Sequence, residues 1–363
     1  MSSLSERDAA TDDLVADIVA LSEIPAPTFH ERPRLDWLEN RLSASPGSRD
    51  RDVAGNLIWR FADPRPRVVV TAHVDTVFAA DIPLTVRHRD GRLIGPGVGD
   101  NAAAIATVIG VIEELTAEGS VELDGVAVAF TVGEEGLGNL HGAQAVCEAL
   151  RPEVLIALEG HGLDSIYVDA VGSLRALITV EGPGGHSWVD RGRPSAVHAL
   201  LALGRRLVEL GTGAAPVNIG MVAGGRSVNA IASDAQLHVE IRALEEQAID
   251  AFARELGRLA VEPPLTIRIE EKGRRSAGRL QEDALLLRVV REVRVELGLP
   301  VTLSAASTDA NAALALSVPA LALGVARGGG MHTVDEWIEI ASLSTGWLQL
   351  SLVLRRLLAA AKS

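Results

Sequence analysis

The segment VAVAFTV at residues 126–132 is uniformly small and apolar, which is typical of a parallel strand that is covered on both faces. The run RVVV at residues 67–70 has the same character, and a helix-like stretch rich in small residues, 101–119, separates the two. Strand, helix and strand in this order predict an α/β architecture around a mostly parallel sheet. We also expect residues 56–63 and 67–75 to pair as a hairpin.

The character of the sequence changes near residue 170 and changes back near residue 278. The stretch 173–183 alternates like a half-exposed strand, and 194–210 has the spacing of an amphipathic helix. The full set expected in this region is four strands (173–183, 217–225, 235–244 and 266–273) and two helices (194–210 and 246–260). We therefore predict an α+β domain at residues 170–277, inserted into a domain formed by residues 1–169 and 278–363.

Length and composition set further limits. A chain of 363 residues exceeds one typical core, and its net charge of −14 argues against a nucleic acid partner. Cys147 is the single cysteine, so neither a disulfide framework nor a thiolate metal site is expected. The acidic start does not resemble a signal peptide, and no apolar run reaches membrane-spanning length. We expect a cytoplasmic protein that binds neither nucleic acid nor membranes.

Polar side chains stand at the ends of apolar elements in the outer, α/β part of the chain. They are His73 with Asp75, Asp100, Glu134 with Glu135, Glu159, and His332. Most of them follow a predicted strand or lie in the loop after one. Because open α/β sheets bind ligands at the carboxyl ends of their strands, we expect these side chains to converge.

The chemistry of this set suits a hydrolytic site for zinc or a similar divalent ion, since it combines imidazoles and carboxylates without cysteine. Asp75 could orient His73 by accepting its second ring N–H. Glu134 and Glu135 are expected to diverge, so that one binds metal and the other acts as general base. Asp100 could offer one oxygen to each of two ions about 3.5–4 Å apart.

Each residue also has a purely structural interpretation. Asp100 precedes a helix and could be its N-cap. Thr333 and Glu336 could form a capping box for the last helix, which would make His332 incidental. The glycine loop GPGVGD before Asn101 lacks the spacing of a phosphate-binding loop. Taken singly these interpretations hold, but together they require several coincidences at strand ends.

The chain resembles the dinuclear zinc metallopeptidase and deacylase family in the order of its motifs. These are H-x-D, G-x-G-x-x-D, E-E, a single acid and a late histidine. Members of the family include carboxypeptidase G, peptidase T, acetylornithine deacetylase, succinyl-diaminopimelate desuccinylase and the aminoacylases. The resemblance covers nearly the whole chain, including GPGGHSW at 182–188. It implies a zinc-exopeptidase-like catalytic domain, a lid and dimerisation domain at 170–277, and a homodimer.

The resemblance also implies a role for each site residue. His73, Asp100 and Glu159 would hold one ion, while Asp100, Glu135 and His332 would hold the other; zinc is favoured, with cobalt or manganese as alternatives. Glu134 would be the general base and Asp75 the partner of His73. His186 would reach the neighbouring subunit's site and stabilise an oxyanion. The substrate contacts implied are Asn229, Arg242, Asp309, Gly329 and Gly330.

The resemblance leaves the substrate open between two branches. Glu159 as the fifth ligand is similar to the carboxypeptidase and deacylase branch, which predicts a small peptide or N-acyl amino acid with a free carboxylate. GGGMHTVDEW at 328–337 is instead similar to peptidase T-like aminopeptidases. A non-catalytic dimeric binding protein would have lost ligands, and none is missing. A nucleotide-binding oxidoreductase would need a completed glycine fingerprint.

Overall fold

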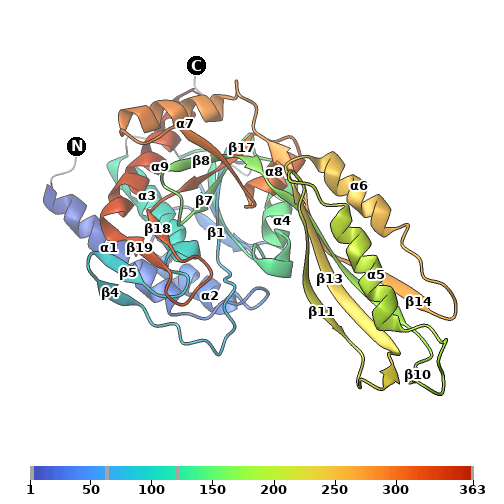
Figure 1. Ribbon diagram of the computed structural model, residues 1–363. Coiled ribbons are helices and arrows are strands. Elements are labelled where there is room, and N and C mark those ends of the chain that lie inside the picture. Colours follow the sequence, from blue (N-terminus) through green and yellow to red (C-terminus); the bar gives the residue numbers. More distant parts are fainter. Residues whose placement is uncertain (1–3, 62–64, 120–122, 361–363) are drawn as a thin grey trace. The chain divides into compact units, whose positions relative to one another are not determined.

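The computed structural model describes residues 4–61, 65–119 and 123–360, and the chain divides into two compact units (Figure 1). Unit 1 comprises residues 1–170 and 279–363, and unit 2 comprises residues 171–278. The chain therefore leaves unit 1 once and returns to it.

A nine-stranded sheet runs through unit 1 in the order β1-β2-β6-β3-β7-β17-β8-β15, with β16 paired to β8. The strands are β1 (Ser48–Arg51), β2 (Leu57–Arg60), β3 (Val68–His73), β6 (Val126–Thr131), β7 (Val154–Glu159), β8 (Ser165–Ala170), β15 (Gly278–Arg279), β16 (Thr302–Ala306) and β17 (Ala320–Gly324). Strands β6, β3, β7 and β17 are mutually parallel. This central block confirms the expected mostly parallel sheet.

Helices cover both faces of this sheet. They are α1 (Leu4–Ser22), α2 (Arg32–Arg41), α3 (Ala104–Glu118), α4 (His141–Leu150), α7 (Leu285–Glu296), α8 (Ala310–Ala315) and α9 (Ile340–Ala360). Val68 and Val70 of β3 point into a core shared with α1, α2, α3, α7 and α9. Val69 points to the other face, where it joins a core shared with α4 and α8. Two covered faces explain why β3 and β6 are apolar at nearly every position.

The expected hairpin of residues 56–63 and 67–75 is wrong. Strand β6 lies between β2 and β3, antiparallel to the first and parallel to the second. An apolar strand such as β6 needs backbone partners on both edges as well as cover on both faces. The helical connection through α3 delivers β6 into that central position.

A small second sheet of unit 1 carries the late histidine. Its order is β18 (Gly328–Gly329), β19 (Trp337–Glu339), β5 (Arg92–Ile94) and β4 (Arg87–Arg89) (Figure 1). Strands β18 and β19 form a hairpin, residues 328–339, whose loop contains His332. The guanidinium of Arg92 stacks on the ring of Trp337 at 3.9 Å from its centroid. The hairpin is thus attached to the rest of unit 1 through β5.

Unit 2 contains an antiparallel four-stranded sheet in the order β11-β13-β9-β14. Its elements are β9 (Gly172–Glu181), α5 (Ala196–Glu209), β11 (Val217–Gly224), β13 (Asp234–Ala243), α6 (Glu246–Leu256) and β14 (Thr266–Arg275), with a two-stranded ribbon of β10 (Gly185–His186) and β12 (Ala230–Ile231). Helices α5 and α6 pack on the sheet through a core of their own. None of the described helices, in either unit, combines the length and apolarity needed to cross a membrane.

Candidate metal centre

The carboxyl ends of the parallel strands bring the polar residues of unit 1 together. His73 is the last residue of β3 and lies beside Thr131, the last residue of β6. Glu159 ends β7 and lies beside Gly324, which ends β17. Since the strands are parallel, their final residues meet at one edge of the sheet. The expected convergence follows directly from this register.

The carboxylate of Asp100 lies between two imidazoles. Its Oδ1 is 3.0 Å from His73 Nε2, and its Oδ2 is 3.1 Å from His332 Nε2. Glu135 Oε1 is 3.3 Å from His332 Nε2, and Glu159 Oε2 is 3.9 Å from His73 Nε2. Asp100 therefore presents one oxygen to each of two histidines, with a further carboxylate beside each histidine.

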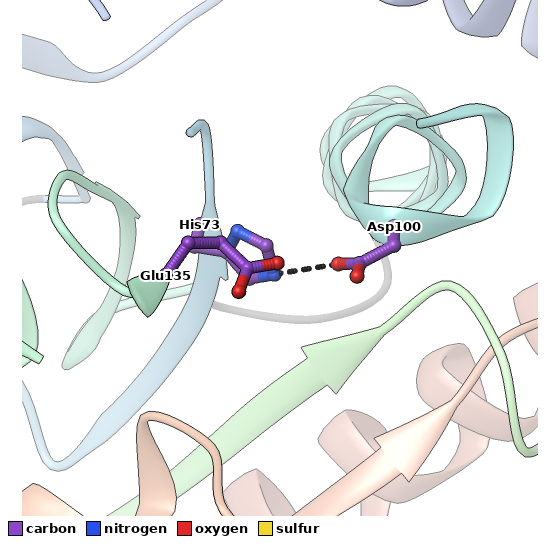
Figure 2. A group of neighbouring side chains, drawn as sticks. All are labelled: His73, Asp100 and Glu135. Atoms are coloured by element: carbon purple, nitrogen blue, oxygen red, sulfur yellow. Dashed lines mark ion pairs between the residues drawn. The ribbon is translucent and has the colours of Figure 1, made fainter. Parts of the chain in front are cut away.

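The donor set fits a divalent metal ion. One ligand atom each from His73, Asp100 and Glu135 lies within 4.8 Å of the other two, and Figure 2 shows the three side chains with the ion pair between His73 and Asp100. Imidazole nitrogen and carboxylate oxygen are the donors of hydrolytic zinc sites. Glu135 is within reach of His73 and lies 3.3 Å from His332 Nε2.

The ionisation of the cluster reflects its own carboxylates. Burial raises the pKa of Asp100, but hydrogen bonds from His332 and His73 outweigh burial and hold the pKa well below its usual value. Burial likewise lowers the pKa of His73, but Asp100 and Asp75 raise it well above its usual value. Hydrogen bonding to Asp100 and Glu135 raises the pKa of His332 to about 10. The carboxylates and imidazoles of the cluster thus stabilise each other's charged forms.

Glu159 is compensated only in part, because the charge of His73 lowers its pKa but does not outweigh burial. Burial raises its pKa well above the usual value, and the nearby charges of Asp100 and Glu134 raise it further. The cluster therefore holds more negative charge than its histidines offset. A divalent cation at the centre would supply the missing charge, which supports a metal site here.

Asp75 organises more of the site than its expected role beside His73. Its carboxylate accepts the backbone N–H of Glu134 (3.1 Å), the backbone N–H of Glu135 (2.8 Å) and the hydroxyl of Thr28 (2.9 Å). His73 Nδ1 is 3.5 Å from Asp75 Oδ1, but it lies closer, at 3.1 Å, to the backbone carbonyl oxygen of Asp75. Asp75 therefore fixes the loop of the two glutamates as well as the orientation of His73.

Glu134 and Glu135 follow β6 in a tightly held loop. Both side chains are almost fully buried. Gly133, immediately before them, donates its N–H to Glu31 Oε1 at 3.0 Å. Burial raises the pKa of Glu31, which receives this bond and another from the backbone of Phe29. Two buried carboxylates, Glu31 and Asp75, thus anchor three consecutive backbone amides.

Two structural interpretations of the sequence are wrong. Asp100 does not cap α3, because it lies within an irregular helical turn (η1, Val98–Ala103) and its side chain makes no capping bond. Thr333 and Glu336 do not form a capping box. Helix α9 begins only at Ile340, and the hydroxyl of Thr333 donates instead to the carbonyl of Gly330. Glu336 is completely buried and bonds to the glycine loop before Asp100.

The other predicted site residues of unit 1 differ in their burial and in their contacts. Asp309 is 3% exposed and accepts a hydrogen bond from Thr131 Oγ1 at 2.7 Å, a setting that favours support of β6 over contact with a ligand. Gly329 and Gly330 lie in the hairpin 328–339, and Gly330 has a φ of +73°. Their predicted substrate contacts stay predictions.

The three candidates in unit 2 are exposed. His186 Nδ1 accepts the backbone N–H of Trp188 at 3.2 Å. Asn229 Oδ1 accepts the hydroxyl of Ser227 at 2.5 Å, and Arg242 Nε donates to Glu240 at 3.1 Å. Their predicted roles in oxyanion and substrate binding stay predictions.

Sequence reasoning missed the buried groups that support the cluster. Arg34 is fully buried and donates to the carbonyls of Ile24 and Val74, each at 3.0 Å. Burial lowers its pKa to about 10, while the carboxylates of Asp75, Asp100 and Glu336 oppose this shift. Nothing in the local pattern of α2 distinguishes Arg34 from its exposed neighbours, because its importance depends on contacts distant in sequence.

Comparison with known proteins identifies the protein family that has this sequence pattern. The profile described as peptidase family M20/M25/M40 matches residues 69–356. A probable carboxypeptidase of Paracoccidioides brasiliensis is 29% identical over 215 residues, which cover 51% of this chain and 47% of that protein. A succinyl-diaminopimelate desuccinylase of Caulobacter vibrioides is 29% identical over 250 residues, covering 61% of this chain and 63% of that protein. The chain thus spans about half the length of the first of these relatives.

A solved structure shows the same fold. The tripeptidase from Staphylococcus aureus aligns with a TM-score of 0.78 over 96% of this chain and 99% of that chain, at 20% sequence identity. The expected fold class, with a central α/β sheet and an additional antiparallel sheet, is confirmed.

Replacing Asp75 by Asn tests its part in the metal centre. The amide would present a donor where the carboxylate now accepts backbone N–H groups, so the loop of Glu134 and Glu135 would lose an anchor. We expect zinc affinity, measured by calorimetric titration of chelator-treated protein, to fall by about 10–100-fold, as is usual when a ligand's supporting carboxylate is lost. Asp81→Asn, at an exposed position, should bind like the wild type. Equal affinity of both variants would contradict this role.

Proposed function

The chain belongs to peptidase family M20/M25/M40, and on this premise we propose that it is a metal-dependent hydrolase. Its substrate would be the amide or peptide bond of a small peptide or an N-acyl amino acid. The observation that carries the proposal is the Asp100 carboxylate between His73 and His332, among buried glutamates at the carboxyl ends of parallel strands. So much buried charge is costly unless a bound cation compensates it, which favours a metal-dependent site.

The bound ions and the side chains would have different roles in the reaction. When bound, divalent ions would polarise the scissile carbonyl and make water more acidic. Glu134 would accept a proton from the attacking water and return it to the leaving amine. Its backbone amide is held by Asp75, and the residue as a whole is 6% exposed, which places its carboxylate in a fixed and largely dry position. His186 would stabilise the oxyanion across a subunit boundary.

We propose two ions, with zinc favoured over cobalt or manganese. His73, Asp100 and Glu159 would hold one ion, and Asp100, Glu135 and His332 the other. The two carboxylate oxygens of Asp100 face different imidazoles, which supports a role for Asp100 as a bridge between the two ions. Glu135 Oε1 lies 3.3 Å from His332 Nε2, which supports the assignment of both residues to the same ion.

Glu159 and the named relatives favour a carboxypeptidase or deacylase. The relatives are a probable carboxypeptidase and a desuccinylase, and a deacylase would act on a substrate with a blocked amino end and a free carboxylate. A peptidase T-like aminopeptidase is the second candidate, favoured by the sequence around His332.

We also propose a homodimer in which a second copy pairs along β11. This strand is an edge of the sheet in unit 2, and its sequence VNIGMVAG carries no charge. Met221 and Val222 are 66% and 63% exposed. The opposite edge, β14, carries charges that discourage strand pairing, whereas β11 has no such protection.

A mixed substrate pool tests the proposed activity. Zinc-loaded and chelator-treated protein would be incubated with N-acyl amino acids, N-blocked dipeptides and free di- and tripeptides, with products followed by mass spectrometry. We expect zinc-dependent release from substrates with a blocked amino end. Cleavage only of substrates with a free amino end would make the protein an aminopeptidase. Zinc-independent cleavage would overturn the proposal.

Replacing Glu134 by Gln tests the general base. The variant keeps the size of the side chain but cannot take up a proton, so turnover should fall by about 10²–10⁴-fold while zinc stoichiometry is unchanged. Glu153→Gln is the matched control, because Glu153 is 64% exposed and pairs only with Arg67 among the described ion pairs. Full turnover by Glu134→Gln would remove this residue from the mechanism.

Lysines at Met221 and Val222 test the dimer. Two added charges on the edge of β11 should repel the same edge of a second copy, so the variant should sediment as a monomer where the wild type sediments as a dimer. Thr266→Lys with Glu271→Lys, at exposed positions of β14, should leave the dimer intact. A monomeric wild type, or dissociation by the β14 pair alone, would contradict pairing through β11.

A further inference from the structure

Three segments of unit 1 meet at the carboxylate of Glu336. Its Oε1 accepts the backbone N–H of Gly99 (2.9 Å) and of Asp100 (2.7 Å), and its Oε2 accepts the N–H of Gly97 (2.9 Å). His161 Nε2 donates to the same Oε1 at 2.7 Å. Glu336 is 0% exposed, so these bonds are not exchanged with water. The carboxylate joins the hairpin 328–339, the glycine loop and the segment after β7.

His161 completes this junction by filling the space between two glycines. A Cβ built on Gly99 would lie 2.2 Å from His161 Nε2, and one built on Gly328 would lie 2.6 Å from His161 Nδ1. At both positions, a residue with a Cβ would fit only if the imidazole ring of His161 shifted. The close approach of the two segments to His161 therefore depends on the absence of a side chain at both positions.

The junction bears directly on the geometry of the proposed metal ligands. Asp100 belongs to the glycine loop, and its own N–H is bonded to Glu336. His332 lies four residues before Glu336 in the hairpin. His332 has a φ of +65°, which is unfavourable for a non-glycine residue, and its side chain is 51% exposed. Apart from its contacts with Asp100 and Glu135, this half-exposed side chain is positioned by the hairpin, so its distance from Asp100 depends on how the hairpin is anchored.

We infer that Glu336 is a positioning residue that fixes Asp100 and His332 relative to each other. Its carboxylate is occupied by backbone N–H groups and by His161, so it would act on the metal ligands through the backbone. Glu336 belongs to the hairpin 328–339 and holds the backbone of Asp100. The loop of the same hairpin carries His332. The effect expected on metal binding and turnover rests on the proposed function, whereas the anchoring of the two segments does not.

A merely structural role would give a different pattern. If Glu336 served only global stability, its replacement would lower the unfolding temperature without a local effect. A positioning role predicts a local change in the glycine loop and the hairpin, together with selective weakening of one of two metal sites. The ion that Asp100, Glu135 and His332 would hold should be affected more than the ion that His73, Asp100 and Glu159 would hold, because only the former has a ligand in the hairpin.

The test compares Glu336→Gln with Asp335→Asn. In Glu336→Gln an amide donor would face backbone N–H groups, whereas Asp335 is 76% exposed and pairs with Arg87 at the surface. Amide hydrogen exchange of chelator-treated protein should be faster in peptides spanning 95–103 and 328–339 of Glu336→Gln only, with β3 and β7 unchanged. Calorimetry should show one of two zinc sites weakened by about 10–100-fold. Turnover should fall through kcat rather than KM.

His161→Leu keeps the inference testable if Glu336→Gln does not fold, because leucine cannot donate a hydrogen bond to Glu336. It removes one of the bonds to Glu336 and should produce the same local exchange with a smaller loss of zinc affinity. Wild-type exchange and zinc binding in either folded variant would overturn the inference while leaving the proposed hydrolase intact. A wild type that binds no zinc would instead overturn the proposed function, and the exchange data would still decide whether Glu336 anchors the two segments.

Discussion

Mutual repulsion among buried carboxylates is the constraint that the structure around the metal centre must satisfy. The buried acids that share this edge of the sheet are Asp75, Asp100, Glu134 and Glu135, with the partly buried Glu159 beside them. Two unit charges about 4 Å apart interact by about 4 kcal/mol near a protein surface. A few such pairs would rival the roughly 5–15 kcal/mol by which a typical domain is stable. The site can persist only if other groups compensate this charge.

The loops that carry these acids are held in place by two buried carboxylates, Asp75 and Glu336, each of which accepts backbone N–H groups. Asp75 receives the N–H groups of the loop that carries Glu134 and Glu135. Glu336 receives those of the loop that carries Asp100. Each ligand-bearing loop is thus fixed by an acid from a different segment of the chain. Arg34 places a buried positive charge near both acids, which offsets part of the cost of burying them.

The errors of sequence reasoning have a common physical cause. The hairpin expected before β3 and the capping box expected at Glu336 both follow from local patterns, and both fail because a distant segment competes for the same groups. Strand β6 takes the edge of β2 that a hairpin would have used. The glycine loop takes the carboxylate of Glu336 that a capping box would have used. A local preference of about 1 kcal/mol gives way when burial offers several hydrogen bonds.

The sequence by itself determined the strands of the central sheet and the residues that end them, because apolar runs and the residues that interrupt them are local properties. Parallel pairing then places His73 and Glu159 at one edge. Only the tertiary structure decided which carboxylate faces which imidazole, and which buried groups hold them. Those choices depend on Glu336, His161 and Arg34, whose partners are distant in sequence and leave no periodic signal.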